Sequence, residues 1–125
     1  MDKENKVTYS EYNIEDVGQV QIADEVIAVI ASIAATEVEG VAKMSGNITS
    51  EIAALVGMKN LSKGVKVKVD DGQVKIALSL ILEYGASIPE VSREVQNRVR
   101  SSLETMTGLE VSEVNLRIAG VQMEP

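Results

Sequence analysis

The side chains that most often carry out catalysis or hold transition metals are missing from this sequence. Its 125 residues include no Cys and no His. A disulfide and a thiolate nucleophile are therefore excluded, and the commonest general base and the commonest transition-metal ligand are absent. Any chemistry would have to come from carboxylates, hydroxyls or amines.

Carboxylates are the only abundant acid–base groups, and they do not form a catalytic pattern. Glu37 and Glu39 are close in sequence, as are Asp70 and Asp71, but both pairs lie near the expected ends of elements, where water solvates them. A general acid and a general base need surroundings that separate their pKa values, and the sequence indicates none. The aspartates also lack the spaced oxygen ligands of a calcium loop. A charged turn is the favoured interpretation of that pair.

Nucleophile and phosphate-binding motifs are absent as well. Ser87, Ser101 and Ser102 have no histidine to activate them. No Gly-x-Gly-x-x-Gly occurs, and residues 57–64 lack the Walker spacing. A Gly-x-x-Gly loop is missing, and three Tyr without Phe or Trp provide no platform for base stacking. The sequence therefore predicts no enzyme, no metal and no cofactor, and it argues against nucleic-acid binding.

Lysines form the one candidate binding site, a docking patch for an acidic partner made of Lys66, Lys68 and Lys75. The first two alternate with valines, and a two-residue turn places Lys68 opposite Lys75. Like charges that face each other across a strand pair destabilise it slightly. The simpler interpretation is a solvated sheet face, since most exposed charges contribute little. The sequence leaves both interpretations open.

A long β-hairpin over residues 63–84 positions these lysines. Residues 64–70 and 73–84 each alternate apolar and polar side chains, as expected for strands with one buried face. Asp71-Gly72 suits the turn between them, because Gly tolerates a positive φ. The resulting register puts the apolar residues of both arms on one face: Val65, Val67, Val69, Val74, Ile76, Leu78, Leu80, Leu82 and Tyr84.

The N-terminal part combines a tail with a very apolar helix. Residues 1–16 carry five acids and two bases with weak patterning, so we expect a flexible acidic tail. A short strand follows at residues 18–22, and Asp24 is positioned to cap a helix that ends near Thr36. Apolar residues nearly encircle this helix, which is typical of a helix central to the fold or covered by a partner.

Two surfaces favour self-association. The first is the apolar helix just described. The second is the other face of the hairpin, which becomes less polar through Ala77, Ser79 and Ile81. We therefore expect this chain to associate with itself or with a protein partner.

The middle of the chain holds less pattern, and a second long helix follows the hairpin. Residues 41–45 are expected to form a strand, and residues 49–57 a short helix. Ser87 and Glu90 make a capping box for the long helix, and Gly108 predicts its end. Its apolar stripe has mostly four-residue spacing: Val91, Val95, Val99, Leu103 and Met106.

A last strand places Val114, Leu116 and Ile118 on one face. Val111 is out of phase with them, which predicts a bend near Ser112-Glu113. The order of elements predicts an α/β (α+β) two-layer sandwich, with a small mixed sheet built on the long hairpin and packed by two main helices. Residues 17–125 are expected to form this single domain behind the tail.

Charge and hydropathy restrict where the chain works. The formal net charge of -7 argues against non-specific binding to nucleic acid. The first residues lack the layout of a secretory signal, and no run approaches the roughly 18 apolar residues that cross a bilayer. We therefore expect a cytoplasmic protein without direct insertion into the membrane.

The order of several short stretches resembles the alkaline-shock protein family, the Gls-type envelope stress response proteins of Gram-positive bacteria. Together they extend over most of residues 18–121. The stretches are residues 18–22, 30–31, 37–41, 63–67, 84–91, 95–96, 106–109 and 114–116. The long hydrophilic extensions of some members of that family are absent here.

The resemblance implies a small non-enzymatic cytoplasmic protein that acts by protein–protein assembly in cell-envelope homeostasis. Some members are recruited to the membrane by a membrane-anchored relative and assemble there, which implies a peripheral location through a protein partner. Others are tied to control of fatty-acid synthesis. The alternative is therefore a regulatory binding module for a metabolic enzyme or, with less support, for RNA. The resemblance carries over no catalytic residue.

Overall fold

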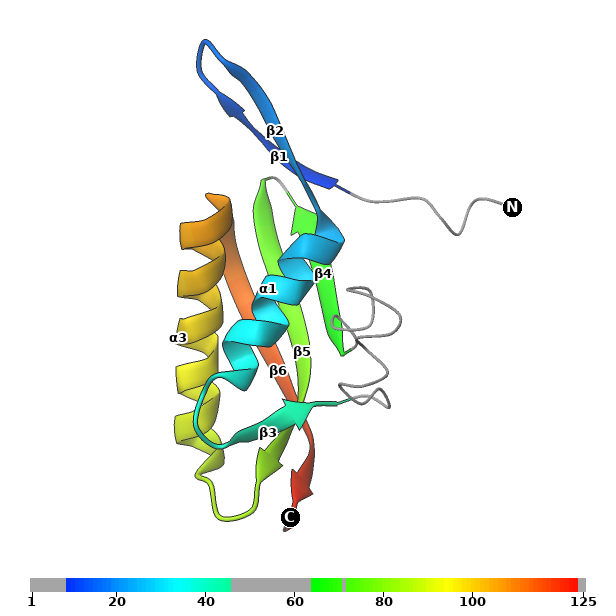
Figure 1. Cartoon of the computed structure of the whole chain (residues 1–125), viewed down its shortest axis with the longest axis vertical. Coiled ribbons are helices and arrows are strands. Elements are labelled where there is room, and N and C mark those ends of the chain that lie inside the picture. The colour runs from blue at the N-terminus through cyan, green and yellow to red at the C-terminus, as the bar shows by residue number, and fades with distance from the viewer. Residues whose placement is uncertain (1–8, 46–63, 71, 124–125) are drawn as a thin grey trace, which may run out of the picture.

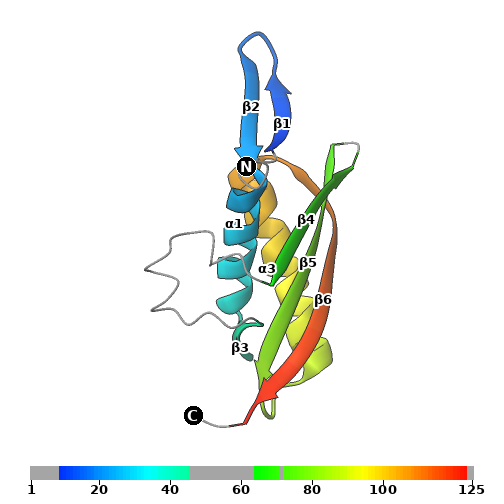
Figure 2. The same cartoon turned by 90° about the vertical axis from the view of Figure 1, so that its right-hand side faces the viewer.

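The computed structural model of this chain describes residues 9–45, 64–70 and 72–123. Within them, the helices α1 (Asp24–Thr36) and α3 (Ile88–Thr107) pack side by side against one face of a sheet (Figure 1, Figure 2). The predicted two-layer α+β architecture is confirmed.

The sheet has four strands within the described residues, and β5 (Gln73–Glu83) lies at its centre. On one edge of β5, β4 (Val65–Asp70) and β3 (Val41–Met44) pair antiparallel and follow one another end to end. On the other edge, β6 (Glu110–Gln122) pairs parallel. The sheet is therefore mixed, as predicted.

Ser79 of β5 lies where β3 and β4 meet. Its N–H donates to the carbonyl oxygen of Gly64 (2.9 Å), and its carbonyl oxygen accepts from the N–H of Ser45 (2.8 Å). Gly64 precedes β4 and Ser45 follows β3, so both strands are tied to one residue of the central strand. The short helix expected at residues 49–57 falls between these two anchors and lies outside the described residues.

The β4–β5 hairpin has the register that the alternation predicts. Asp70 pairs with Gln73 and Val65 with Leu78. Gly72 has φ +77°, so the turn uses the conformation that favours glycine, while Asp71 lies outside the described residues. The alternate residues of β5 are at most 1% exposed and form the centre of the core: Val74, Ile76, Leu78, Leu80 and Leu82.

The prediction that Tyr84 shares this buried face is wrong. β5 ends at Glu83, and the Tyr84 side chain is 69% exposed. The chain turns at this point, because the N–H of Ala86 donates to the carbonyl oxygen of Glu83 and Gly85 has φ +95°. Alternation therefore stops one residue earlier than the sequence suggests.

Helix α3 begins and ends as predicted. The N–H of Glu90 donates to Ser87 Oγ (3.5 Å) at the N-terminus, and Gly108 adopts φ +78° at the C-terminus. Four buried residues of the expected stripe face the core: Val91, Val95, Val99 and Leu103.

Met106 does not continue this stripe, contrary to the prediction, and is 68% exposed. Thr107, which lies four residues after Leu103, takes the buried position instead. Its hydroxyl donates to the carbonyl oxygen of Leu103 (2.6 Å) and accepts from the N–H of Leu109 (3.1 Å). These two bonds satisfy the buried hydroxyl, so a polar residue occupies a core position.

Strand β6 contains the predicted bend and a second irregularity. Val111 pairs with Val74 but Glu113 pairs with Lys75, which leaves Ser112 as an extra residue. A second shift, between the partners of Leu80 and Ile81 and not predicted, leaves Ala119 extra. Such bulges bend a strand, and the first one lets both Val111 and Val114 reach the core.

Helix α1 lies in the core, but Asp24 is not its cap. Ala23 occupies the N-cap position without a side-chain hydrogen bond, and Asp24 is the first helical residue. Its Oδ1 instead accepts from Ser10 Oγ (3.1 Å). Ile27 is fully buried, whereas Ile33 remains 48% exposed on the outer side of the helix.

Part of the segment predicted as a tail, residues 9–14, forms a strand. β1 (Tyr9–Ile14) pairs antiparallel with β2 (Gly18–Ala23), which includes the predicted strand. This hairpin forms a separate sheet that projects beyond the end of the helices (Figure 1). Tyr12 and Ile22 pack against the core and fix its base, whereas Tyr9 is 53% exposed. The division into a tail and a domain from residue 17 stays a prediction.

Candidate functional site

One face of the four-stranded sheet carries no helix within the described residues, as Figure 2 shows on the side of β4, β5 and β6. The β5 residues that alternate with the core positions point to this open face: Gln73, Lys75, Ala77, Ser79, Ile81 and Glu83. Residues that pair directly across strands share a face, so the register assigns their partners in β3, β4 and β6 to it as well.

The structure brings the three predicted lysines together on this open face. Lys68 pairs directly with Lys75, and Lys66 pairs with Ala77. Lys66 and Lys68 are exposed, whereas Lys75 is half-buried. On its other side, Lys75 pairs with Glu113 of β6. The lysine pair near the turn thus has a carboxylate neighbour, which weakens its positive field.

A second set of bases on the same face has no acid among its register partners. Lys66 pairs with Ala77, Arg117 pairs with Ser79 and Lys43 pairs with Ile81. Sequence reasoning missed Arg117 and Lys43. Alternation alone puts Arg117 opposite the apolar residues of its strand, but only the parallel pairing of β6 with β5 places it near Lys66.

Small residues make this part of the face hollow. A groove of about 290 Å³ is lined by Gly64, Val65, Lys66, Ala77, Leu78, Ser79, Asn115, Leu116 and Arg117. The short side chains of Ala77 and Ser79 form its floor. Ala77 lies between Lys66 and Asn115, and Ser79 lies between Gly64 and Arg117. Lys66 and Arg117 stand on its two sides. This sheet-face groove can accept a small apolar protrusion with acidic flanks.

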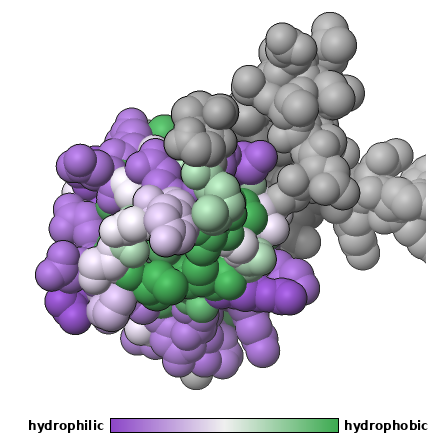
Figure 3. All heavy atoms as spheres, turned by 90° about the horizontal axis from the view of Figure 1, so that it is seen from below, coloured by the Kyte–Doolittle hydropathy of each residue, from purple (hydrophilic) through white to green (hydrophobic). Residues whose placement is uncertain are grey.

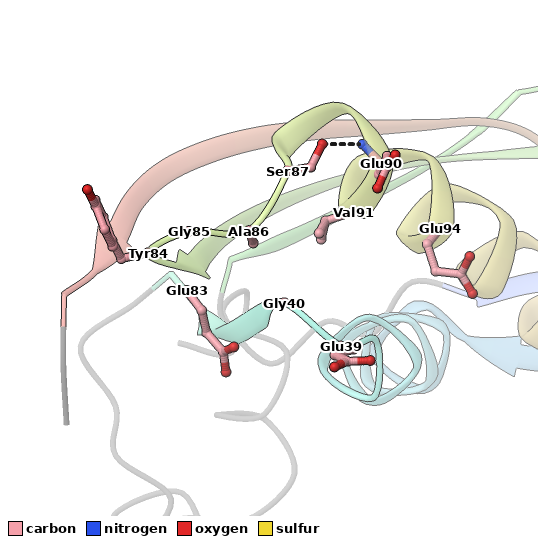
Figure 4. A pocket seen from close by; sticks show the side chains of 10 residues that line it. All are labelled: Glu39, Gly40, Glu83, Tyr84, Gly85, Ala86, Ser87, Glu90, Val91 and Glu94. Atoms are coloured by element: carbon pink, nitrogen blue, oxygen red, sulfur yellow. Dashed lines mark hydrogen bonds between the residues drawn. The ribbon is translucent and has the colours of Figure 1, made fainter.

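A second hollow of about 460 Å³ lies at the start of α3, between the β5–α3 turn and Gly40 (Figure 4). Four carboxylates line it, from Glu39, Glu83, Glu90 and Glu94. In the described residues, these and other acidic side chains form no group of three that could hold a metal ion. Apolar residues gather at this end of the molecule, and polar residues surround them where the described residues are visible (Figure 3).

The hollow at the start of α3 depends on a close backbone contact. Gly40 has φ +102°, and a Cβ added there would lie 2.7 Å from Val91 Cγ2. Both features restrict this position to glycine. The requirement is explained by the packing of α3 against the turn before β3, so it does not by itself indicate a ligand.

Polar side chains elsewhere hold elements together. Arg98 Nη1 lies 3.4 Å from Glu37 Oε1 and links α3 to the end of α1 at an exposed position. Glu104 Oε2 accepts from the N–H of Val111 (3.0 Å) and links α3 to β6. Each contact ties two elements together, so a structural role accounts for it.

Asp24 lies where the β1–β2 hairpin meets α1, and its surroundings change the pKa of its carboxyl. Partial burial raises the pKa of the Asp24 carboxyl, and the hydrogen bond from Ser10 lowers it by a smaller amount. Asp24 faces β1 and not a hollow, so its geometry indicates attachment of the hairpin to α1. Neither α1 nor α3 is both long enough and apolar enough to cross a membrane.

Comparison with known proteins identifies related chains. The model of the alkaline-shock protein 23 family, described as having a cell envelope-related function, matches residues 12–123. YqhY of Bacillus subtilis is 40% identical over 122 residues, which cover 98% of this chain and 90% of YqhY. YloU of the same bacterium is 33% identical over 108 residues, covering 85% of this chain and 90% of YloU.

A homologue of the stress response regulator gls24 from Streptococcus pyogenes is also similar. It is 28% identical over 106 residues, which cover 84% of this chain but 59% of the homologue. No solved structure matches this chain.

Proposed function

We propose that this chain, which belongs to the alkaline-shock protein 23 family of cell envelope-related function, supports the envelope stress response by assembling with other proteins. The stress-response part of this proposal draws on the similarity to the gls24 homologues. The assembly part rests on the open sheet face. We propose no catalytic role, because the described carboxylates and hydroxyls are engaged in structural contacts or stand exposed.

The observation that carries the proposal is the concentration of bases on one exposed face of an acidic protein. Five of the twelve bases lie on the open face: Lys43, Lys66, Lys68, Lys75 and Arg117. The same register puts four acids toward the two ends of this face, Asp70, Glu83, Glu110 and Glu113, whereas Lys43, Lys66 and Arg117 between them have no acid among their register partners. A local positive field of this kind attracts partners of the opposite sign and mainly increases the rate of encounter. An acidic protein surface is the partner that fits it.

We propose further that the protein works in the cytoplasm and reaches the membrane through a protein partner. Surface helices that bind anionic lipid directly are amphipathic and rich in Lys and Arg. Helix α1 contains no base, and α3 balances Arg93, Arg98 and Arg100 against its glutamates. A membrane-anchored protein is therefore a better receptor for this chain than the lipid surface.

A flotation experiment tests both the recruitment to the membrane through a protein and the contribution of the lysines to it. The parent chain should stay at the bottom of a gradient with vesicles of pure anionic lipid. It should rise with membrane vesicles from the cells that express it, and protease treatment of those vesicles should abolish the effect. Changing Lys66, Lys68 and Lys75 to Glu should reduce flotation about tenfold or more.

The matched control changes Arg93, Arg98 and Arg100 of α3 to Glu. It alters the net charge by the same amount on exposed positions, and it sacrifices two exposed contacts, that of Arg98 with Glu37 and that of Arg100 with the carbonyl oxygen of Ser112. Flotation of this control should match that of the parent. The proposal would be contradicted if the parent floated with vesicles of pure lipid, or if both triple variants lost flotation to the same extent. Retention of the parent by a soluble metabolic enzyme alone would favour the regulatory alternative.

A further inference from the structure

The net charge of the chain arises entirely from one continuous segment. Residues 9–42 contain seven acids and no base: Glu11, Glu15, Asp16, Asp24, Glu25, Glu37 and Glu39. The remaining residues hold twelve acids and twelve bases, so they sum to zero. The acidic segment begins with the β1–β2 hairpin, whereas the five bases of the open face follow it. The hairpin therefore carries acids without bases, while the bases around the sheet-face groove lie on another surface of the same molecule.

The tip of the β1–β2 hairpin is a free acidic knob. Every residue from 13 to 19 is exposed, and the knob includes two apolar side chains, Ile14 at 42% and Val17 at 79% exposure. Glu15 and Asp16 lie between them, and Glu11 lies on the same arm. The knob thus combines a small apolar centre with acidic flanks.

The base of this hairpin is fixed, so the knob has a defined position. Tyr12 and Ile22 pack against the core, and Ser10 is buried and bonded to Asp24. The hairpin extends beyond the end of α1, on the helix side of the four-stranded sheet, whose open face lies on the other side (Figure 2). The knob therefore cannot reach the sheet-face groove of the same molecule.

We infer that the tip of the β1–β2 hairpin of one copy occupies the sheet-face groove of a second copy. This inference rests on the proposed function, and it names the partner and the contact. Ile14 and Val17 lie over the floor of Ala77 and Ser79. Glu11, Glu15 and Asp16 face the bases around the groove, namely Lys43, Lys66 and Arg117.

The other hollow is a poor site for the same knob. The hollow at the start of α3 is lined by four glutamates, so an acidic tip would meet like charges there. Juxtaposed like charges suppress wrong pairings. Charge alone therefore directs the knob to the open face of the sheet.

The contact joins two different surfaces, so its symmetry differs from that of a closed dimer. Each copy offers one knob and one groove, and a heterologous contact of this kind builds rings or open chains. A hairpin tip buries less surface than the roughly 1,200 Å² of the smallest standard interfaces. The association is therefore weak, and its charged rim makes it weaker in salt, over a Debye length of about 8 Å at physiological ionic strength.

Charge reversal tests the contact in sedimentation velocity runs over a concentration series of the full chain. The hairpin variant changes Glu11 and Glu15 to Lys. Asp16 is left unchanged because its φ of +64° already restricts that position. The sheet variant changes Lys66 and Arg117 to Glu. Each variant alone should associate roughly tenfold more weakly than the parent.

Combination of the changes separates a direct contact from lost folding. A mixture of the hairpin variant and the sheet variant should associate again, because a basic knob then meets an acidic groove. A chain carrying all four changes should associate with itself. The matched control, Glu39→Lys with Glu94→Lys, reverses two exposed acids elsewhere and should behave like the parent.

The outcomes distinguish this contact from the proposed function. If both variants associate as strongly as the parent does, the inferred contact is wrong, and the protein assembles through another surface. If mixing the two variants restores nothing, the contact is likewise wrong. A parent that is monomeric at every concentration and salt level overturns self-association altogether, while recruitment to membrane vesicles remains measurable by flotation.

Discussion

The protein contains two antiparallel hairpins that differ in what lies against them. One face of the β4–β5 hairpin is covered by α1 and α3, and its central residues are at most 1% exposed. The β1–β2 hairpin touches the core only at its base, and residues 13–19 are exposed. Both turns contain a residue with positive φ, Gly72 at +77° and Asp16 at +64°. Local turn chemistry is therefore similar, and burial makes the difference.

This comparison indicates which hairpin defines the fold and which is available to a partner. A one-residue slip in β5 would move five large apolar side chains to the open face, so burial fixes its register. A slip in β1 would move few buried groups. The β1–β2 hairpin can thus change at its tip without loss of the core.

The largest expected difference between the hairpins is the cost of truncating one side chain. Leu80→Ala removes a fully buried side chain and should lower the free energy of unfolding by about 2–5 kcal/mol. Ile14→Ala, the matched change in β1, should alter it by less than about 0.5 kcal/mol. Urea unfolding of both variants measures the two values. Equal losses would show that the projecting hairpin belongs to the cooperative core.

A valine in each turn gives the next largest effect. Gly72→Val should cost about 1–3 kcal/mol, because a β-branched residue resists positive φ. A Cβ at Gly72 meets no atom within 4 Å, so this cost comes from the backbone alone. Gly72→Asn should cost less, since Asn tolerates this conformation. An unchanged urea midpoint for Gly72→Val would refute the turn geometry.

Asp16→Val makes the corresponding change in the projecting hairpin. Its global cost should stay below about 1 kcal/mol, because the tip can open locally while the core remains folded. The strain should appear instead as faster amide hydrogen exchange in residues 13–19, with unchanged exchange in β5. Slower exchange at the tip, or a loss as large as that of Gly72→Val, would contradict this interpretation.

The smallest effect concerns the junction between the hairpin and α1. The raised pKa of Asp24 means that the folded state retains its proton to a higher pH than the unfolded state. Asp24 should therefore destabilise the fold above its folded pKa, and this penalty should disappear as the pH falls below about 3.9, the ordinary value for Asp. The stability of the parent relative to Asp24→Asn should thus decrease from acid to neutral pH.

Urea unfolding of the parent and Asp24→Asn at several pH values measures this difference. Ser10→Ala provides the control, because loss of the bond that lowers the pKa of Asp24 should make the decrease steeper. A stability difference that is constant with pH, or that grows toward neutral pH, would contradict the assignment.

Alternating hydrophobicity was sufficient to predict the β4–β5 register, because each buried side chain lies two residues from the next. The caps of α3 were equally readable in Ser87 and Gly108. Strand β1 escaped prediction because its side chains alternate weakly, with most of them exposed. Met106 was misplaced because its apolar character outweighed the four-residue spacing that leads to Thr107.

Alternating hydrophobicity was also enough to predict about half of the candidate site. Lys66, Lys68 and Lys75 follow from the hairpin register alone. Arg117 joins them through the parallel pairing of β5 and β6, whose register contains two bulges. Lys43 joins them across another bulge. The out-of-phase Val111 signals the first bulge of β6, but the hydrophobic pattern signals neither the other bulges nor which strands pair, so these two bases are visible only in the structure.

The double attachment at Ser79 has a consequence for how the length of the chain can vary. The segment that leaves the sheet at Ser45 returns to it at Gly64, and both residues bond to the backbone of Ser79. Within the described residues, β3 and β4 pair with β5 on either side of this connection. The loop-closure entropy of a flexible connection rises by only about 0.6 kcal/mol for each doubling of its length. Because Ser45 and Gly64 are both held by Ser79, a change in the length of the chain between them can leave these two anchors, and with them the strand register, in place.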